Sequence, residues 1–357
     1  MITSRDTAAR HAEPGPAAGA PRPSRDLVAR MGARYGLLAV WALLIVVFAV
    51  LNADVFLRPL TAQTIASTKA VVAILALAAL VPLVVGQFDL SVASQFGLAQ
   101  ALCAGLIVKQ DLPAWLAPLI VLAVGALFGL ANGVLVAVVR INAFVTTLAT
   151  GTLAVGLTQW YTGGGQIIGA FPGSFTGAGR SSVAGVPLPF VYVIVIVLAL
   201  WALLEYTRWG RRAFAVGGNE RASLLSGINV RRMTITSFVI AGVIAGFAGV
   251  LQVTILGAAS PEVGAQFLLP AFAGVFLGAA VLRPGRFNAW GTVIAVYFLA
   301  TGITGLQQLG APFYIEQFFN GCALLIAVAI AQFSAQRRRR AAAAVGQARE
   351  RPAPAGA

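Results

Sequence analysis

Charged side chains are scarce in this chain. Of its 357 residues, 10% are Asp, Glu, Lys or Arg, whereas 59% are hydrophobic, and the mean hydropathy is +0.87. Soluble domains carry roughly 25% charged residues, so this chain has too few polar side chains to cover a soluble fold of its length. The high apolar content also excludes an intrinsically disordered protein. The composition therefore predicts an integral membrane protein with several spans.

Histidine and cysteine are almost absent. The single histidine, His11, lies in a segment rich in Ala and Pro, and the two cysteines, Cys103 and Cys322, lie in apolar runs. A zinc site or a histidine-dependent catalytic triad therefore lacks its components, and we predict no metal site. We expect both cysteines to be small core residues and not a disulfide.

A phosphate-binding loop is absent as well. The sequence contains no G-x-x-x-x-G-K-[ST] motif, and the glycine run 163–165 has no following lysine. We therefore expect no ATP hydrolysis by this chain, and an ATP-driven process would need a separate ATPase subunit. Only Asp89 and Glu205 bring a carboxylate near the apolar runs, and both lie near a run's end. This disfavours an ion-coupled transporter without excluding one.

Ten apolar runs approach the length of about 20 residues that a helix needs to cross a bilayer. They predict an all-α, polytopic transmembrane helical bundle of about ten helices. The range is eight to eleven, because only Gly86–Asp89 separates the second run from the third. The runs are 36–53, 63–86, 89–108, 114–138, 143–161, 187–206, 233–257, 267–282, 288–308 and 318–334.

The cations define an orientation and two tails. With both termini in the cytoplasm, 21 of the 25 Lys and Arg residues lie on the inner side. Such asymmetry follows the positive-inside rule, and it explains the net charge of +14 by contact with the lipid bilayer and without nucleic acid. We predict disordered basic cytoplasmic tails at 1–35 and 335–357 around a membrane domain at 36–334, and no signal peptide. The outer cations are Arg58, Lys69, Lys109 and Arg180.

Two connections are longer than the rest, an outer one at 162–186 and an inner one at 207–232. The inner one predicts a helix of about two turns. Asn219 is a good N-cap, and Gly227 suits the left-handed residue that ends a helix. Exposed Leu224 and Leu225 would then form either a docking site for a partner or an ordinary connecting turn, and the residues alone leave both open.

Segment 210–230 resembles the cytoplasmic coupling loop of ATP-binding-cassette (ABC) importer permeases of the ribose type. Segments 88–94 and 140–148 resemble two further motifs of these permeases, and the resemblance covers about 35–335. Ser223 and Ala93 depart from it, as does 265–287, a region that helps to line the pathway in relatives. The coupling-loop residues that we single out are Gly217, Gly218, Asn219, Glu220, Ala222, Leu224, Leu225, Ser226, Gly227, Ile228 and Asn229.

The resemblance implies a permease subunit of an ABC importer in a bacterial inner membrane. It implies a ribose-, xylose- or galactose-like monosaccharide, an extracytoplasmic binding protein that delivers it, and an ATPase subunit that holds ATP and Mg²⁺. It also implies a second permease copy. Alternatives are a permease for branched-chain amino acids or another small polar solute, an ion-coupled secondary transporter, and a non-transporting scaffold.

Polar side chains within the apolar runs are candidates for the translocation pathway, because they are costly in a bilayer and usually face a cavity or a partner. Most are neutral hydroxyls and amides, which suit an uncharged polyol better than an ion. The alternative is that they bond their own helix or join helices, and that Asp89 caps a helix. The candidates are Asp89, Ser91, Ser94, Gln95, Asn142, Phe144, Thr146, Thr147 and Gln252. The glycines that we expect to allow close helix packing are Gly242, Gly246, Gly249, Gly274 and Gly278.

Overall fold

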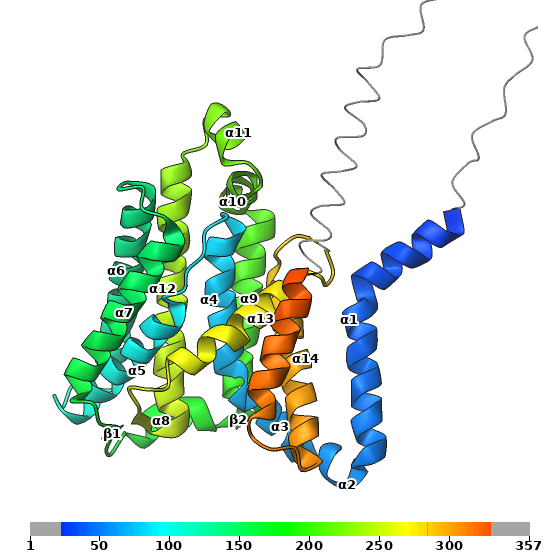
Figure 1. Cartoon of the computed structure of the whole chain (residues 1–357). Helices are drawn as coiled ribbons and strands as arrows, with labels where there is room; N and C mark the ends of the chain where they lie inside the picture. The colour runs from blue at the N-terminus through cyan, green and yellow to red at the C-terminus, as the bar shows by residue number, and fades with distance from the viewer. Residues whose placement is uncertain (1–22, 284, 330–357) are drawn as a thin grey trace, which may run out of the picture.

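The computed structural model describes residues 23–283 and 285–329, and these residues are predominantly helical (Figure 1). Within them, sheet is limited to two antiparallel ribbons of two strands each, β1 with β4 and β2 with β3. In chain order the elements are α1 Pro23–Leu51, α2 Ala53–Phe56, α3 Pro59–Thr68, α4 Ala70–Val84, α5 Val92–Val108, α6 Leu116–Ala137, α7 Ala143–Thr162, β1 Ile167–Ile168, α8 Gly173–Arg180, β2 Ser182–Val183, β3 Val186–Pro187, α9 Leu188–Tyr206, α10 Arg208–Gly218, α11 Glu220–Leu225, α12 Val230–Leu256, β4 Ala258–Ala259, the 3₁₀ turn η1 Ala265–Phe267, α13 Leu268–Gly278, α14 Ala289–Gln308 and a last helix Ile315–Ala329.

The predicted apolar runs are largely helical wherever the structure describes them. Five helical stretches are long and apolar enough to cross a membrane, and four shorter helices are also apolar. The prediction of an all-α membrane protein is confirmed, while the number of crossings and the side of the termini stay predictions. The five are Pro59–Val84, Leu116–Ala137, Leu188–Tyr206, Val230–Leu256 and Ala289–Gln308; the four are Tyr35–Leu51, Val92–Val108, Ala265–Gly278 and Ile315–Ala329.

The first helix corrects the predicted boundary of the N-terminal tail. We expected disorder through residue 35, but α1 begins at Pro23 and continues into the apolar run. Arg and Ala are strong helix formers, so a helix can extend beyond its apolar part without a change of structure at that point. The rest of the predicted tails, 1–22 and 335–357, lies outside the described residues.

Helix α4 is the centre of the bundle. All of its residues are buried, and it packs against α12, α13, α14 and α9 (Figure 1). A helix that is apolar on every side is stable only when other helices surround it. The run that contains α4 is interrupted at Lys69, where α3 ends, and after Val84, where a non-helical segment at 85–91 leads to α5. This interruption brings polar residues into the bundle.

Helices α6 and α12 make the most extensive contact between two elements. A Cβ atom added to Gly129 of α6 would overlap the carbonyl oxygen of Phe238, and Gly125 and Gly242 meet in the same way, backbone to backbone. Small residues at a helix–helix interface in a membrane permit this close approach. The predicted packing role of the α12 glycines is confirmed, whereas the sequence analysis missed the glycines of α6.

Replacing Gly129 with alanine tests this contact. Alanine favours a helix by about 1 kcal/mol over glycine, but overpacking costs about 1–3 kcal/mol, so we expect a lower melting temperature of the detergent-solubilised protein. The matched control is Gly156→Ala on α7, where no atom lies within 4 Å of the added Cβ. Equal or higher stability of both variants would contradict the close contact.

Candidate functional site

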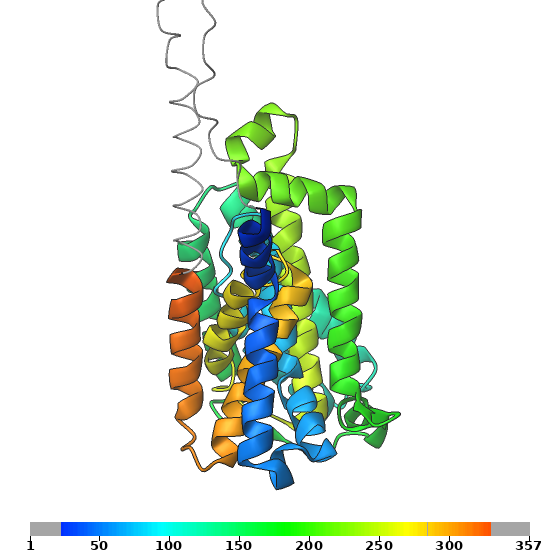
Figure 2. The ribbon, with the colours of Figure 1, turned by 90° about the vertical axis from the view of Figure 1, so that its right-hand side faces the viewer.

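Two short helices stand outside the bundle at one end and form what we term the arm, residues 207–229 (Figure 2). We call this side of the molecule the arm end and the opposite side the far end. The sequence analysis expected one helix here, but the structure has two, because α10 is also helical. Its buried residues Gly210, Ala213 and Val216 recur every third position, so one face of α10 packs on the bundle.

Helix α11 confirms the predicted local signals. The side-chain oxygen Oδ1 of Asn219 accepts a hydrogen bond from the backbone N–H of Ala222 at 2.9 Å, so Asn219 is the N-cap. Gly227 has φ of +77°, and its N–H donates to the carbonyl of Leu224 at 3.0 Å. Glycine adopts this left-handed conformation without a steric penalty, which ends the helix.

The tip of the arm is apolar and exposed. Leu224 and Leu225 are 62% and 86% exposed, whereas Ser223 on the opposite face is buried and Ile228 packs against the core. Adjacent exposed leucines on a segment outside the bundle fit a docking surface, and they also fit an ordinary connecting turn. The structure thereby places the two leucines as the docking hypothesis requires.

The arm is attached firmly to the central helix. Gly217 lies so close to the end of α4 that an added Cβ would overlap the carbonyl oxygen of Val84. The indole N–H of Trp209 donates to the hydroxyl of Thr236 on α12 at 2.9 Å. A displacement of the arm must therefore move the adjoining ends of α4 and α12.

A second attachment joins the arm to the connection between α13 and α14. The guanidinium of Arg286 lies 3.8 Å from the ring centroid of Phe214 in α10, a cation–π contact. Arg286 and Arg283 also reach the carboxylate of Glu205, at 3.5 and 2.6 Å. The arm, the end of α9 and the α13–α14 connection consequently form one linked unit at the arm end.

A buried polar network lies where segment 85–91 meets α5 and α6. The carboxylate oxygen Oδ1 of Asp89 accepts from the backbone N–H of Ser91 at 3.0 Å and from its hydroxyl at 2.5 Å. The Ser91 oxygen in turn accepts from the side-chain amides of Gln95 and Asn132, each at 2.8 Å. One hydroxyl thus donates once and accepts twice, which uses its full capacity.

This network leaves acceptors unused. Oδ2 of Asp89, Oε1 of Gln95 and Oδ1 of Asn132 are buried and have no hydrogen-bond partner among the described residues. Buried polar groups are normally satisfied by protein or by water, so the site has capacity for polar contacts. Asn132 was missed in the sequence analysis, although a lone amide within the apolar run 114–138 was a signal that could have found it.

Helix α7 supports the same site. The Thr147 hydroxyl accepts from the N–H of Leu90 at 3.1 Å and donates to the carbonyl of Ala143 at 2.8 Å. The hydroxyl of Thr146 is buried without a partner among the described residues, and Ser94 of α5 lies against Gly151. The structure therefore brings together six of the pathway candidates. These are Asp89, Ser91, Ser94, Gln95, Thr146 and Thr147.

Three pathway candidates lie apart from this network. Asn142 is the N-cap of α7, where its side chain accepts from the N–H of Phe144 at 2.9 Å. Phe144 is 53% exposed, and Gln252 is half-buried in α12. Asn142 instead joins a hollow at the arm end whose lining includes Gln87, Arg140, Glu220, Leu224, Arg231 and Thr234. The segment 140–148 and the arm, which are distant in the sequence, share this hollow.

Comparison with known proteins identifies relatives over most of the chain. A family model described as the branched-chain amino acid transport system / permease component matches residues 61–328. This match includes the arm, the network around Ser91 and all helices from α4 to α14. Among solved structures, none matches the chain.

Individual relatives are import permeases. The ribose import permease protein RbsC of Bacillus subtilis (strain 168) is 34% identical over 289 residues, 81% of this chain and 89% of its own length. The same protein of Escherichia coli (strain K12) is 35% identical over 72% of this chain and 81% of its length. The autoinducer 2 import system permease protein LsrD of Escherichia coli O9:H4 (strain HS) is 33% identical over 75% of this chain and 82% of its own length.

Replacing Ser91 with alanine tests the network. The change leaves the amides of Gln95 and Asn132 and the carboxylate of Asp89 without their shared partner, and an unsatisfied buried group costs about 1–3 kcal/mol. We expect a clear fall in melting temperature. The control is Ser94→Ala, at a half-buried position with no side-chain hydrogen bond in the described chain. Equal effects of the two changes would show that Ser91 has no central role.

Proposed function

This chain belongs to the permease family of branched-chain amino acid transport systems, and from that premise we propose that it is the membrane subunit of an ATP-driven sugar importer. The solute is a monosaccharide of the ribose, xylose or galactose kind, delivered by an extracytoplasmic binding protein. A separate ATPase subunit holds ATP and Mg²⁺, and two permease copies assemble around the pathway. The names of the relatives, which include ribose import permeases, support the sugar class.

The arm carries this proposal. Its exposed Leu224 and Leu225 form a small apolar tip on α11, which projects beyond the bundle (Figure 1). Seating this tip in a cleft of the ATPase would remove the exposed apolar surface from water. The rigid attachments of the arm to α4, α12 and the α13–α14 connection supply the route by which ATPase closure moves the membrane helices.

The distribution of cations supports an arm that faces the cytoplasm of a bacterial inner membrane. The arm end carries Arg140, Arg283 and Arg286 besides the arginines of the arm and of the start of α12, whereas the predicted outer side has four cations. Cytoplasmic loops hold the excess of Lys and Arg in multi-pass proteins. The arginines of the arm and the start of α12 are Arg208, Arg211, Arg212, Arg221, Arg231 and Arg232.

The polar network suits a neutral solute more than an ion. Its free groups are mostly amide and hydroxyl oxygens, and segment 85–91 interrupts the helices at this point. Interrupted helices in transporters commonly mark the region that the solute passes. We therefore place the pathway along segment 85–91, α5 and α7, and Gln87 of this segment and Ala143 of α7 line the hollow beside the arm.

A permease for branched-chain amino acids is the second candidate, and the description of the matching family favours it. The run Gly217-Gly218-Asn219 resembles the coupling loop of the sugar permeases, and the names of the relatives also favour the sugar class. A secondary transporter would remain active without the arm, whereas an ATP-driven importer would not. Uptake of labelled sugars and of labelled leucine by cells that produce the complete system separates these candidates.

Replacing Leu225 with aspartate tests the docking of the ATPase. A charge at the centre of an apolar contact must be desolvated without a partner, which costs several kcal/mol, so we expect at least a 10-fold loss of ATPase co-purification and of sugar uptake. The amount of permease in the membrane should stay unchanged, because Leu225 makes no contact with the core.

The matched control is Ile168→Asp, the same kind of change at the far end, where Ile168 is 71% exposed. This variant should bind the ATPase like the wild type. An L225D variant that retains the ATPase and full uptake would refute the coupling role of the arm. A cysteine introduced at Arg221 that reacts only with reagents added outside would refute the orientation.

A further inference from the structure

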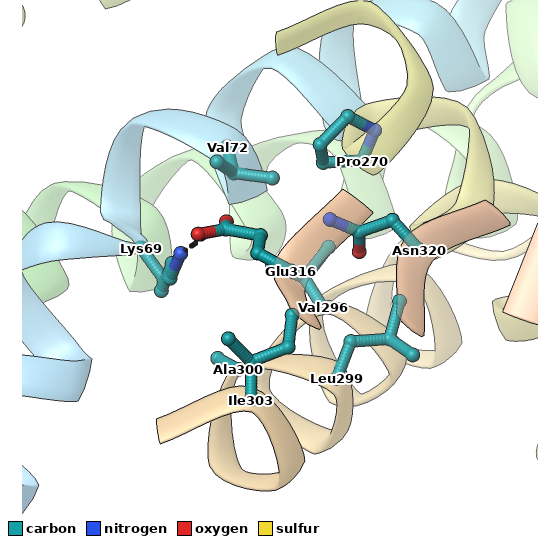
Figure 3. Close-up of a pocket in the computed structure, with 9 residues that line it drawn as sticks. All are labelled: Lys69, Val72, Pro270, Val296, Leu299, Ala300, Ile303, Glu316 and Asn320. Carbon is teal, nitrogen blue, oxygen red and sulfur yellow. Dashed lines mark hydrogen bonds and ion pairs between the residues drawn. The ribbon is translucent and has the colours of Figure 1, made fainter. Parts of the chain in front are cut away.

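A pocket at the far end has no part in the function described so far. It lies between the α3–α4 junction, α13, α14 and the last helix, and Figure 3 shows its lining. Lys69 at the α3–α4 junction and Glu316 of the last helix form an ion pair across it, with Nζ and Oε1 2.7 Å apart. The two residues are 247 positions apart in the sequence. Ionisable side chains within a membrane bundle usually mark a functional place.

The charges in this pocket are already compensated. The Lys69 and Glu316 side chains are 20% and 35% exposed, so both are largely withdrawn from solvent and neutralise each other. The pair has no net charge with which to attract an ion. It does hold ammonium donors and carboxylate acceptors at fixed positions, and each group has hydrogen-bonding capacity beyond the single contact between them.

Asn320 supplies the observation that points to a ligand. It is 5% exposed, it lines the pocket, and it lies one turn after Glu316 on the same face of the last helix (Figure 3). Its amide makes no hydrogen bond to any part of the chain that the structure describes. The amide nitrogen and oxygen of Asn320 are not among the fully enclosed polar atoms of the described residues. A solute that enters the pocket can therefore reach them and make the hydrogen bonds that the chain does not supply.

The remaining lining places apolar side chains on both sides of the polar groups (Figure 3). Val72 and Pro270 lie on one side of Glu316 and Asn320, and Leu299 lies on the other side (Figure 3). Gln266 and Gln317 line the adjoining, wider cavity of about 380 Å³, which shares Lys69, Glu316 and Asn320 with the pocket. A pocket with an apolar wall and a few convergent polar groups is typical of a site for a small molecule. A sugar offers both kinds of surface, since its C–H groups are apolar and its hydroxyls both donate and accept.

We infer that this pocket binds the neutral polyhydroxylated solute at the far end of the permease, before it reaches the network around Ser91. Adjacent hydroxyls of the solute pair with the oxygen and nitrogen of the Asn320 amide, and further hydroxyls contact Glu316 and Lys69. The pocket has unused hydrogen-bonding groups but no uncompensated charge. We therefore expect it to bind a neutral solute and not a zwitterion such as an amino acid. The inference rests on the proposed sugar transport and assigns that transport an entry site.

The test compares Asn320→Leu with the wild type. Leucine keeps the buried volume and removes the unpaired amide, so the variant should fold at least as stably. Saturation-transfer NMR on the purified permease in nanodiscs, with D-ribose, D-xylose, D-galactose and L-leucine as probes, should show contact with at least one sugar. That signal should fall at least about tenfold in N320L, the change expected on losing a bidentate contact. The control is Asn52→Leu, at a half-buried far-end amide that donates a hydrogen bond to the carbonyl of Gln308.

A charge exchange, Lys69→Glu with Glu316→Lys, separates binding from structure. If the pair serves only stability, the exchange should restore the melting temperature that Glu316→Gln lowers and should leave sugar contact intact. If the pair orients the solute, the charge-exchanged variant should regain the melting temperature but should show no sugar contact. Sugar signals equal in N320L and the wild type, no sugar signal at all, or a signal from L-leucine alone would each overturn the inference.

Uptake separates this inference from the proposed function. In proteoliposomes with the ATPase and binding protein, the wild type should import sugar, and N320L should import it with a lowered rate while ATP hydrolysis persists. Normal import by N320L would overturn the entry site and leave the importer intact. Absence of ATP-dependent import in the wild type would instead refute the proposed function.

Discussion

The fold depends on one constraint: inside an apolar layer, a polar group must find its partner within the protein. The hydroxyls of Thr150 and Thr158 meet this constraint by donating to carbonyls one turn earlier in their own helix. Ser91 meets it by serving three other side chains. The same rule gives meaning to the exceptions, and the buried oxygens without a partner around Ser91 are among them.

The two ends of the molecule have different chemistry, and the central helix connects them. At the arm end, Gly217 lies against the carbonyl of Val84, and Arg286 joins Phe214 to Glu205. At the far end, Lys69 precedes the first residue of α4. Because α4 is buried on every side, its neighbours must adjust when it moves. A push on the arm and a ligand at the far end therefore act on the same element.

The sequence was sufficient to predict those elements whose ends are set by residues close by in the chain. The N-cap at Asn219 and the left-handed Gly227 define α11 within a few residues, and both were readable because capping depends on nearby backbone groups. The start of α1 was not predictable from composition, since arginine and alanine fit either a tail or a helix. The helical state of α10 was missed because its stabilising face, with Ala213 and Val216, is completed only by packing on the bundle.

The sequence by itself determined that the chain is a helical membrane protein and where its apolar helices lie, because hydropathy along the chain is a property of successive residues. It also identified the arm tip and, as polar positions within apolar runs, the six pathway candidates at 89–95 and 146–147. Only the tertiary structure decided that Asn132 completes the Ser91 network and that Lys69 meets Glu316. These contacts join distant segments, and their partners are fixed by how the helices pack and not by any local pattern.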